Sequence, residues 1–396
     1  MLSIAIVGSG PYGLSLAAYL NGLGIDFRIF GPCMESWEKH MPQGMFLKSE
    51  GFASDLYAPG KGFPLADYCR EQDLPYDDVG APVPRATFAA YGREFQRRMV
   101  PALEQTWVTR VRQIPEGFAL DLASGETVQA RRVVLAVGIT HFPWLPPELE
   151  GFSTESVTHS FQHSDVSRFR GKRVLVIGAG ASATDVAVEL ANAGAETELL
   201  ARPSQLAFQL PPGGPRSLWE RMKTPRTTIG GGWRSKFAVD MPLVFHLLPE
   251  KLRHAIVARH LGPAPGWFMR AKFEGRVKAH LGCQIEAVSE SPSGVRVRVR
   301  FRGPGGEPLE TSVDHVIAAT GFKPFLRRLS FLDPELSAKI GTAEGTPDLD
   351  RNFRTTVPGL YMMGPVAANN FGPVCRFACG AEFTVKRLAP HLAQTR

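Results

Sequence analysis

The hydrophobic pattern of the chain begins with a short apolar run, Ile4 to Val7, that passes directly into a glycine-rich turn. Four apolar residues bounded by a turn are typical of a strand buried in a parallel sheet. Beyond the turn, Leu and Ala recur at near-helical spacing before a second apolar run ends at Phe30. The pattern over residues 4–30 therefore predicts a strand, a glycine turn, a helix and a second strand.

The same order of elements recurs in mid-chain, at residues 173–200, in the string RVLVIGAGASATDVAVELANAGAETELL. Short alternating runs follow each unit, at 107–122 and 284–301, and are typical of a small antiparallel meander. Each meander is followed by an apolar run that ends in a glycine, at 131–138 and 314–322. Two copies of one supersecondary unit in a single chain indicate an internal duplication.

The duplication predicts an α/β protein built from two Rossmann-like dinucleotide-binding domains, each of three layers. We expect the second domain to be inserted into the first, since the C-terminal string VPGLYMMG would complete the first sheet. The predicted boundaries are residues 1–155 plus 316–396 for the first domain and residues 156–315 for the second.

Both glycine turns fit the dinucleotide fingerprint G-x-G-x-x-G/A. In this pattern the first glycine allows the tight turn, the second lets the backbone approach a pyrophosphate, and the third lets the helix pack closely on the strand. The free N–H groups at the helix N-terminus then face the phosphates. The fingerprint positions are Gly8, Gly10 and Gly13 in the first loop, and Gly178, Gly180 and Ala183 in the second. Between them lie Pro11, Tyr12, Ala181 and Ser182, which we expect to contact the same ligands.

The residue that follows the second strand of such a unit distinguishes one nucleotide from another. A carboxylate there binds the ribose hydroxyls, whereas an arginine accommodates a 2′-phosphate. The second unit has Arg202 at this place, which favours NADPH over NADH. The first unit has Gly31 where an acidic residue is expected, so ribose binding falls to the backbone or to Glu35 or Ser36.

Composition and charge narrow the function classes. The 396 residues are 44% hydrophobic and carry a formal net charge of +7 without any dense Lys/Arg run, which argues against nucleic-acid binding. The five cysteines are scattered, with no Cys-x-x-Cys pair, and no metal-ligand cluster stands out. The N-terminus lacks the features of a signal peptide, and no run of about 18 apolar residues occurs. We expect a cytoplasmic protein without a transmembrane segment, and its oligomeric state, including a homo-oligomer, stays open.

Residues 203–275 form the least regular stretch, rich in Pro, Gly, Arg and Trp. A segment of this length inside a compact domain is usually functional or disordered. We interpret it as a cap-like insertion over the active site, with a surface excursion or an oligomer contact as the alternatives. The apolar run around 241–260 fits a core-packed helix better than a helix lying on a membrane surface.

With these motifs in hand, the chain resembles the class B flavoprotein monooxygenases, which include flavin-containing monooxygenases, Baeyer–Villiger enzymes and ornithine/lysine N-hydroxylases. The resemblance rests on the two glycine loops, the ATGF string at 319–322, the lead-in FRGKRVLVIGAG and Trp37 in MESW. It covers most of the chain outside residues 203–275.

The resemblance implies that the cofactors are FAD at the first loop and NADPH at the second, with O2 and a small molecule as substrates. In this family NADPH reduces FAD, O2 adds to give a flavin C4a-hydroperoxide, and a nitrogen or sulfur atom, or a carbonyl group, is oxygenated. Because the flavin carries the chemistry, no catalytic triad is expected.

Lys48, in a string similar to the FLK of ornithine N-hydroxylases, is the first catalytic candidate implied by the resemblance. Asn369 and Asn370, in the C-terminal segment expected beside the flavin ring, are the others. Each has a plain alternative, a surface lysine or ordinary turn residues. His159 and His163, near the domain junction, fit packing or capping better than catalysis. The resemblance also implies cofactor contacts at Gly31, Ser36, Trp37, Met45, Val108, Gly138, Thr320, Gly321, Gly364, Pro365, Phe371 and Gly372.

Two other functions remain compatible with the sequence. An NAD(P)H-dependent flavoprotein reductase or dehydrogenase shares the two-domain plan, although the missing Cys-x-x-Cys argues against its disulfide branch. A flavin-binding protein without turnover is the second alternative, because Gly31 departs from the usual acidic position.

Overall fold

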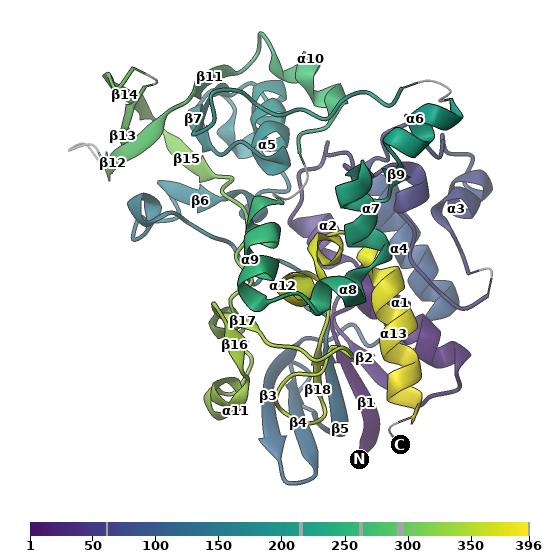
Figure 1. The fold of residues 1–396 in the computed structure, drawn as a ribbon. Coiled ribbons are helices and arrows are strands. Elements are labelled where there is room, and N and C mark those ends of the chain that lie inside the picture. The colour runs from purple at the N-terminus through teal and green to yellow at the C-terminus, as the bar shows by residue number, and fades with distance from the viewer. Residues whose placement is uncertain (61, 214–216, 261–263, 291–296, 304, 395–396) are drawn as a thin grey trace.

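The computed structural model describes residues 1–60, 62–213, 217–260, 264–290, 297–303 and 305–394. Two sheets lie at opposite ends of the molecule, and helices from the middle and the end of the chain fill the space between them (Figure 1). Residues 291–296, which include part of the second predicted meander, lie outside the described residues.

The first sheet has the order β2-β1-β5-β4-β3, with β18 also paired to β5. Its parallel strands are β1 (Leu2–Val7), β2 (Arg28–Phe30), β5 (Thr127–Leu135) and β18 (Leu360–Met362). The antiparallel part consists of β3 (Val108–Ile114) and β4 (Gly117–Leu122). Because β1, β2 and β5 are parallel and in register, Val7, Phe30 and Leu135 end side by side at one edge of the sheet.

Helices from both ends of the chain cover this sheet. They are α1 (Pro11–Gly22), α2 (Glu35–Lys39), α3 (Leu65–Glu71), α4 (Arg85–Met99) and α13 (Gly380–Gln394). Helix α1 starts at a proline, which suits the first helical position because its missing N–H would have no partner there. Helices α1 and α13 pack together beside the sheet (Figure 1). The C-terminus therefore completes the unit that the N-terminus begins.

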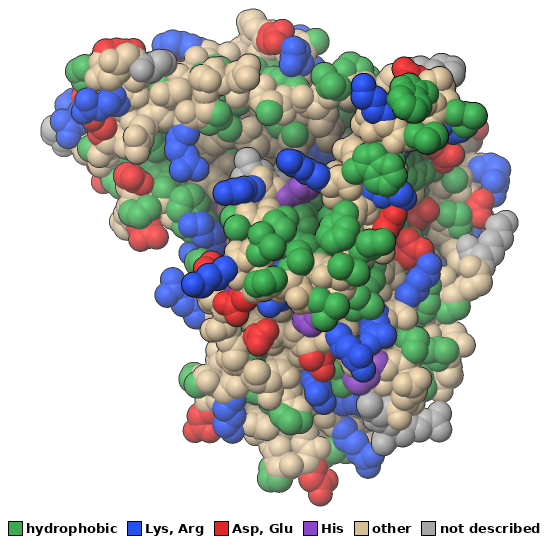
Figure 2. All heavy atoms as spheres, in the orientation of Figure 1, with side chains coloured by type: hydrophobic (Ala, Val, Ile, Leu, Met, Phe, Trp, Pro, Cys, Tyr) green, Lys and Arg blue, Asp and Glu red, His purple; other side chains and the backbone are tan. Residues whose placement is uncertain are grey.

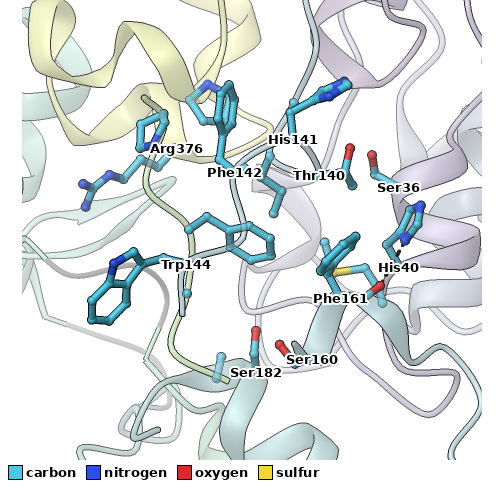
Figure 3. Close-up of a pocket in the computed structure, with 18 of the residues that line it drawn as sticks. Ser36, His40, Thr140, His141, Phe142, Trp144, Ser160, Phe161, Ser182 and Arg376 are labelled. Carbon is cyan, nitrogen blue, oxygen red and sulfur yellow. Dashed lines mark hydrogen bonds between the residues drawn. The ribbon is translucent and has the colours of Figure 1, made fainter. Parts of the chain in front are cut away.

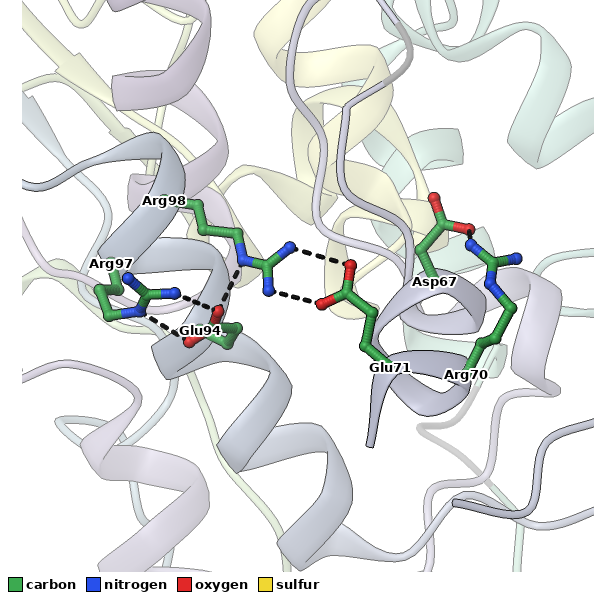
Figure 4. A network of polar contacts seen from close by, with 6 residues as sticks. All are labelled: Asp67, Arg70, Glu71, Glu94, Arg97 and Arg98. Carbon is green, nitrogen blue, oxygen red and sulfur yellow. Dashed lines mark hydrogen bonds and ion pairs between the residues drawn. The ribbon is translucent and has the colours of Figure 1, made fainter. Parts of the chain in front are cut away.

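Surface ion pairs join α3 to α4. Arg98 contacts Glu71 Oε2 at 2.5 Å and Glu94 Oε1 at 2.6 Å, and Glu94 also contacts Arg97 (Figure 4). Exposed pairs of this kind contribute only about 0–1 kcal/mol each. The stability of this unit therefore comes mainly from its buried core, in which Tyr91 is fully enclosed.

The second sheet is parallel, in the order β11-β8-β7-β15-β6. Its strands are β6 (Val157–His159), β7 (Arg173–Ile177), β8 (Glu196–Ala201), β11 (Lys278–Leu281) and β15 (His315–Ala318). Helix α5 (Ala181–Asn192) contributes to the core on one face of the sheet. The meander β12 (Gln284–Glu290), β13 (Val297–Arg302) and β14 (Pro308–Val313) contributes to the core on the other. The prediction of an α/β chain with two Rossmann-type units is confirmed.

The pairing of strand β15 bears on the position at which the chain returns to the first unit. Its residues pair with β7 on one side and β6 on the other, so they complete the second sheet. The predicted boundary at residue 316 falls inside this strand, because the sequence did not show which sheet the ATGF-bearing strand would join. We therefore propose that the first domain resumes after Ala318.

The segment 203–275 folds into short elements, several of which lie between the two sheets, while the last of them packs against α5 of the second unit (Figure 1). They are α6 (Leu218–Lys223), β9 (Arg226–Thr227), β10 (Gly230–Gly231), α7 (Trp233–Asp240), α8 (Pro242–His246), α9 (Glu250–Arg259) and α10 (Arg270–Phe273). The C-terminal part adds α11 (Pro334–Lys339), β16 (Thr342–Ala343), β17 (Thr346–Pro347) and α12 (Ala368–Phe371). Helices α8 and α9 pack against α12. Within the described ranges, none of the helices has the length and apolar character needed to cross a bilayer.

Candidate functional site

A large cavity, of about 1290 Å³, is lined by residues from both units. It reaches the carboxyl ends of β1 and β2 in the first sheet and of β7, β8 and β15 in the second. Ligands of open α/β sheets bind outside these strand ends. In Figure 3, Ser36 and Thr140 from the first unit and Ser160 and Ser182 from the second surround the same space. The volume exceeds the roughly 300–1,000 Å³ typical of a pocket for one drug-sized ligand.

The first glycine loop has the geometry that its fingerprint requires. Gly8 has a φ of +109°, and a Cβ there would collide with the carbonyl oxygen of Ala136. A Cβ at Gly13 would collide with the carbonyl oxygen of Gly8, so α1 can approach β1 only through a glycine. Gly10 is different, because nothing lies within 4 Å of the place where its Cβ would be, and it lines the cavity. The loop therefore keeps open backbone where a pyrophosphate would lie.

The second loop repeats this arrangement. Gly178 has a φ of +148°, and a Cβ there would collide with the carbonyl oxygen of Ala319. Gly180 faces open space in the cavity, as Gly10 does. Ala183 is fully buried at the third position, so the structure has room for one methyl group where α5 meets β7. Both loops thus fit a dinucleotide by the same physical criterion.

Gly31 lies where the first unit was expected to carry an acidic side chain. Its φ is +133°, its N–H donates to the carbonyl of Glu104, and Ser9 Oγ donates to its carbonyl at 2.8 Å. Close to it in sequence, Glu35 and Ser36 both line the cavity. These two side chains are the available partners for a ribose at this end.

Arg202 lies at the corresponding end of the second unit and lines the cavity with Lys323 and Trp144. The Lys323 ammonium sits 3.7 Å from the centre of the Trp144 ring. Burial lowers the pKa of Lys323, and the nearby charges of Arg328 and Arg202 lower it further. Arg202 and Lys323 thus place two basic side chains in this part of the cavity wall, an arrangement that suits an anionic group. Sequence reasoning did not find Lys323 or Trp144, because neither belongs to a glycine loop.

Lys48 lines the cavity, but its ammonium group is already paired. Lys48 Nζ contacts Asp185 Oδ2 at 2.7 Å and Oδ1 at 3.0 Å, and donates to the carbonyl of Phe46 at 2.9 Å. Both side chains of the pair are buried. Asp185 belongs to α5, so the pair joins the first unit to the helix that follows the second glycine loop. The surface-lysine alternative is therefore wrong, and a structural role for Lys48 accompanies any catalytic one.

Asn369 and Asn370 do not line the cavity. Asn370 is buried, donates to the carbonyl of Pro347 at 2.9 Å and accepts from the backbone of Leu349 at 3.2 Å. Asn369 donates to Thr346 Oγ1 at 3.0 Å. Their amides hold α12 on the β17 loop, so the expected direct contact with a flavin ring has no support in this geometry.

The other predicted contact residues divide between the cavity and the packed interior. Those lining the cavity are Pro11, Tyr12, Ser36, Trp37, Met45, Val108, Gly138, Ala181, Ser182, Thr320, Gly321, Gly364 and Pro365. Phe371 instead stacks on the His246 ring at 4.9 Å, and Gly372 lies against Phe245. Both therefore pack against α8, and no sequence motif indicated that this helix would cover α12.

Several cavity residues had no recognisable motif. His40, His141 and Phe142 line it from loops, and Phe161 lines it from a short 3-10 helix at Ser160–Gln162 (Figure 3). Burial lowers the pKa of His141, which favours its neutral form. From the predicted cap, Pro203 and Ala258 are the lining residues. The segment 203–275 therefore forms part of one wall of the cavity, and most of its residues do not line the cavity.

Next to the cavity, two buried histidines share one hydroxyl group. His315 Nδ1 lies 2.9 Å from the carbonyl of Glu155, so it carries the proton and Nε2 accepts from Thr158 Oγ1 at 2.7 Å. Because the single hydroxyl proton of Thr158 is donated to His315, His163 Nε2 must donate to Thr158 Oγ1, also at 2.7 Å. Both imidazoles are then neutral, which agrees with the packing role predicted for His163.

Acid is expected to destabilise the fold through this pair. Burial lowers the pKa of His163 to about 3 and that of His315 to about 4, against about 6.5 in an unfolded chain. Between these values the unfolded chain binds more protons, so the free energy of unfolding falls as pH falls. Urea unfolding at about pH 7 and about pH 4.5 should show this loss, and His163→Gln should show a smaller one. Equal stabilities at both pH values in the wild type would contradict the assignment.

The comparisons with known proteins agree with this geometry. Residues 5–212, more than half of the chain, match the family model described as pyridine nucleotide-disulphide oxidoreductase. The chain belongs to this family. None of the five cysteines lines the cavity, and all five are free and buried, so the described residues contain no redox disulfide at the site.

Related proteins include monooxygenases and a reductase. A probable indole-3-pyruvate monooxygenase of Arabidopsis thaliana is 29% identical over 50% of this chain, and the match spans 47% of that relative's length. A trimethylamine monooxygenase of Pelagibacter ubique is 27% identical, with 54% of each chain covered. A ferredoxin–NADP reductase of Thermus thermophilus is 23% identical over 92% of this chain and 84% of its own.

Solved structures share the whole fold. The ornithine N-hydroxylase of Kutzneria sp. 744 covers 100% of this chain and 99% of its own, with a TM-score of 0.77 at 19% identity. A bacillithiol disulfide reductase from Staphylococcus aureus gives a TM-score of 0.68 at 18% identity over 100% and 99% of the two chains. The resemblance to flavoprotein monooxygenases is confirmed for the fold and for related sequences.

Proposed function

We propose that the chain is an FAD- and NADPH-dependent monooxygenase that oxygenates a nitrogen or sulfur atom, or a carbonyl group, of a small molecule. The observation that carries this proposal is the cavity shared by both glycine loops, which contains no cysteine among its lining residues. One cavity for two dinucleotides lets a hydride pass between them. Without a disulfide at the site, the electrons require another acceptor, and O2 is the acceptor in the related monooxygenases.

The first loop would hold FAD. The open backbone at Gly10 and the N-terminus of α1 suit its pyrophosphate, and Glu35 or Ser36 would bind its ribose. Tyr12 donates to the carbonyls of Cys375 and Phe377 at 3.0 and 2.9 Å, which fixes the C-terminal segment beside this loop. These hydrogen bonds would hold this part of the cavity wall in place for the cofactor.

The second loop would hold NADPH, with Gly180 at the pyrophosphate and Arg202 at the 2′-phosphate. When bound, the flavin supplies electron transfer from NADPH and the activation of O2. The protein's own residues bind, orient and exclude water, and the apolar side chains of Met45, Phe142 and Phe161 suit that task. The nitrogen-oxygenating relatives favour an amine nitrogen as the atom that reacts.

Arg202→Ala is expected to weaken NADPH while leaving NADH unaffected. A charge-assisted contact with the 2′-phosphate is worth about 1.5–3 kcal/mol, so the KM for NADPH should rise about 10- to 100-fold. Steady-state flavin reduction with each nucleotide measures the difference. Arg170→Ala, at an exposed arginine of the same unit, is the control and should change neither value. An equal loss for both nucleotides would show that Arg202 does not contact the 2′-phosphate.

A reductase is the second candidate function, and the match to ferredoxin–NADP reductase over 92% of the chain favours it. The two functions differ in what receives the electrons. The two functions can be separated by measuring NADPH consumption with amines, thiols, sulfides and ketones. Peroxide release and oxygenated product are measured in the same reactions. Oxygenated product in proportion to NADPH supports the monooxygenase. Rapid reduction of ferredoxin, with no oxygenated product from any compound, would support the reductase instead.

A further inference from the structure

The segment 218–252 carries most of the exposed large hydrophobic side chains of the described residues. Ten of sixteen belong to it, although it is less than a tenth of the chain. They are Leu218, Trp219, Met222, Trp233, Phe237, Met241, Leu243, Val244, Leu247 and Leu252. We call the surface they form the 218–252 face. Figure 2 shows hydrophobic side chains gathered where Figure 1 places α7 and α8, and again at α6.

The face arises because its short helices bury one side and leave the other without a partner. In α8, Phe245 is buried against the core while the neighbouring Val244 is exposed. Leu247, at the end of the same helix, is 81% exposed, and Trp219 on α6 is 71% exposed. Scattered surface leucines are ordinary, but a contiguous apolar area marks an interaction site. The prediction of a core-packed run at 241–260 is therefore correct for one side of the helices only.

Basic side chains outnumber acidic ones within the 218–252 segment. The segment has six Lys/Arg residues, namely Arg221, Lys223, Arg226, Arg234, Lys236 and Lys251, against three acidic residues. Of the acids, Asp240 is paired with Lys236 at 2.6 Å, and Glu220 accepts hydrogen bonds from Ser217 at the start of α6. The third acid is Glu250, so six basic against three acidic residues leave the segment that carries the exposed tryptophans and leucines with an excess of positive charge.

We propose that the 218–252 face binds the surface of a lipid bilayer that contains anionic lipids. Trp, Leu and Met side chains enter the boundary between headgroups and acyl chains, while long Lys and Arg side chains reach anionic headgroups. A second copy of the chain fits less well, because a symmetric contact would bring the basic side chains against one another. Charge complementarity therefore selects the bilayer.

The face is joined to the wall of the cavity. Arg376, which lines the cavity, donates to the carbonyls of Val257 and His260 at 3.1 and 2.7 Å, at the C-terminal end of α9. Ala258 in the same stretch also lines the cavity. Docking would therefore bring this wall of the site near the lipid. The binding itself needs no turnover, so its test is independent of the proposed monooxygenase function.

Sedimentation with vesicles tests the proposal. The full chain is mixed with vesicles of phosphatidylcholine and phosphatidylglycerol at low salt, and with vesicles of phosphatidylcholine alone. We expect binding to the anionic vesicles to be the stronger and to weaken at high salt. Leu218→Ser combined with Leu247→Ser should lower the partition coefficient at least about tenfold, because two apolar side chains no longer enter the bilayer. Lys223→Gln with Lys251→Gln should lower binding to the anionic vesicles only.

The matched control is Leu74→Ser combined with Leu309→Ser, two exposed leucines outside the 218–252 face. It should bind vesicles as the wild type does, and circular dichroism checks that all variants are folded. Wild-type chain that stays in the supernatant with anionic vesicles at low salt overturns the proposal. The proposal is also overturned if the wild type does not bind vesicles but forms a dimer and the Leu218→Ser/Leu247→Ser variant is monomeric. That result would assign the 218–252 face to a second copy of the chain.

Discussion

Gly10→Val is expected to give a folded chain that purifies without FAD. The backbone at Gly10 has φ −83° and ψ −170°, which any residue adopts, and nothing lies within 4 Å of a Cβ there. The valine side chain would instead enter the cavity where the pyrophosphate must approach the backbone. We expect FAD affinity to fall more than about 100-fold, and flavin absorbance per mole of purified chain measures the loss.

Two further variants make this result specific. Gly180→Val introduces the same side chain on nearly the same backbone, φ −86° and ψ −177°, and should keep FAD while losing NADPH. Gly13→Val should fail to fold, because its side chain would collide with the carbonyl oxygen of Gly8. A yellow Gly10→Val protein with normal FAD content would show that the first loop does not hold the pyrophosphate.

The glycine loops were predictable because their requirements are local. A tight turn, an open backbone and a close helix are each set by residues within six positions of one another, and the structure shows each at Gly8, Gly10 and Gly13. The doubly wound fold follows from the same strings, since a buried apolar run before such a turn fixes a parallel strand. The fold class and the geometry of the glycine loops could therefore be predicted from the sequence.

Contacts between segments that are distant in the chain could not be predicted from the sequence. Asn370 was expected in the cavity from its place in the chain, but its side chain turns toward Pro347 and accepts from Arg253, a residue of the irregular segment. Lys323 and Trp144 lie 179 positions apart, and they meet where the backbone N–H of Trp144 donates to the carbonyl of Gly321. Periodicity and local motifs give the direction of a strand, but the partner of a polar side chain depends on how whole units pack.

Lys48→Met is expected to cause the largest loss of stability among single changes in the cavity wall. It leaves the Asp185 carboxylate buried without its cation, since the Asp185 side chain is 1% exposed and, among the described residues, only Lys48 forms a salt bridge with it. Removing one partner of a buried ion pair typically costs about 3–5 kcal/mol. Urea unfolding at neutral pH measures the fall in the free energy of unfolding.

The pH dependence identifies the cause of that loss. Burial raises the pKa of Asp185, and Lys48 opposes the rise, so the pKa should climb further when the lysine is removed. A carboxyl whose pKa is higher in the folded chain binds protons there first, so the stability gap between the variant and the wild type at the same pH should narrow as pH falls and widen as pH rises. Lys48→Met combined with Asp185→Asn removes the charge and should recover much of the loss at neutral pH. Because the pair joins the first unit to α5, the single variant should also bind NADPH more weakly, and the double variant should restore part of that binding. A double variant no more stable than Lys48→Met would show that lost packing, rather than an unpaired charge, explains the defect.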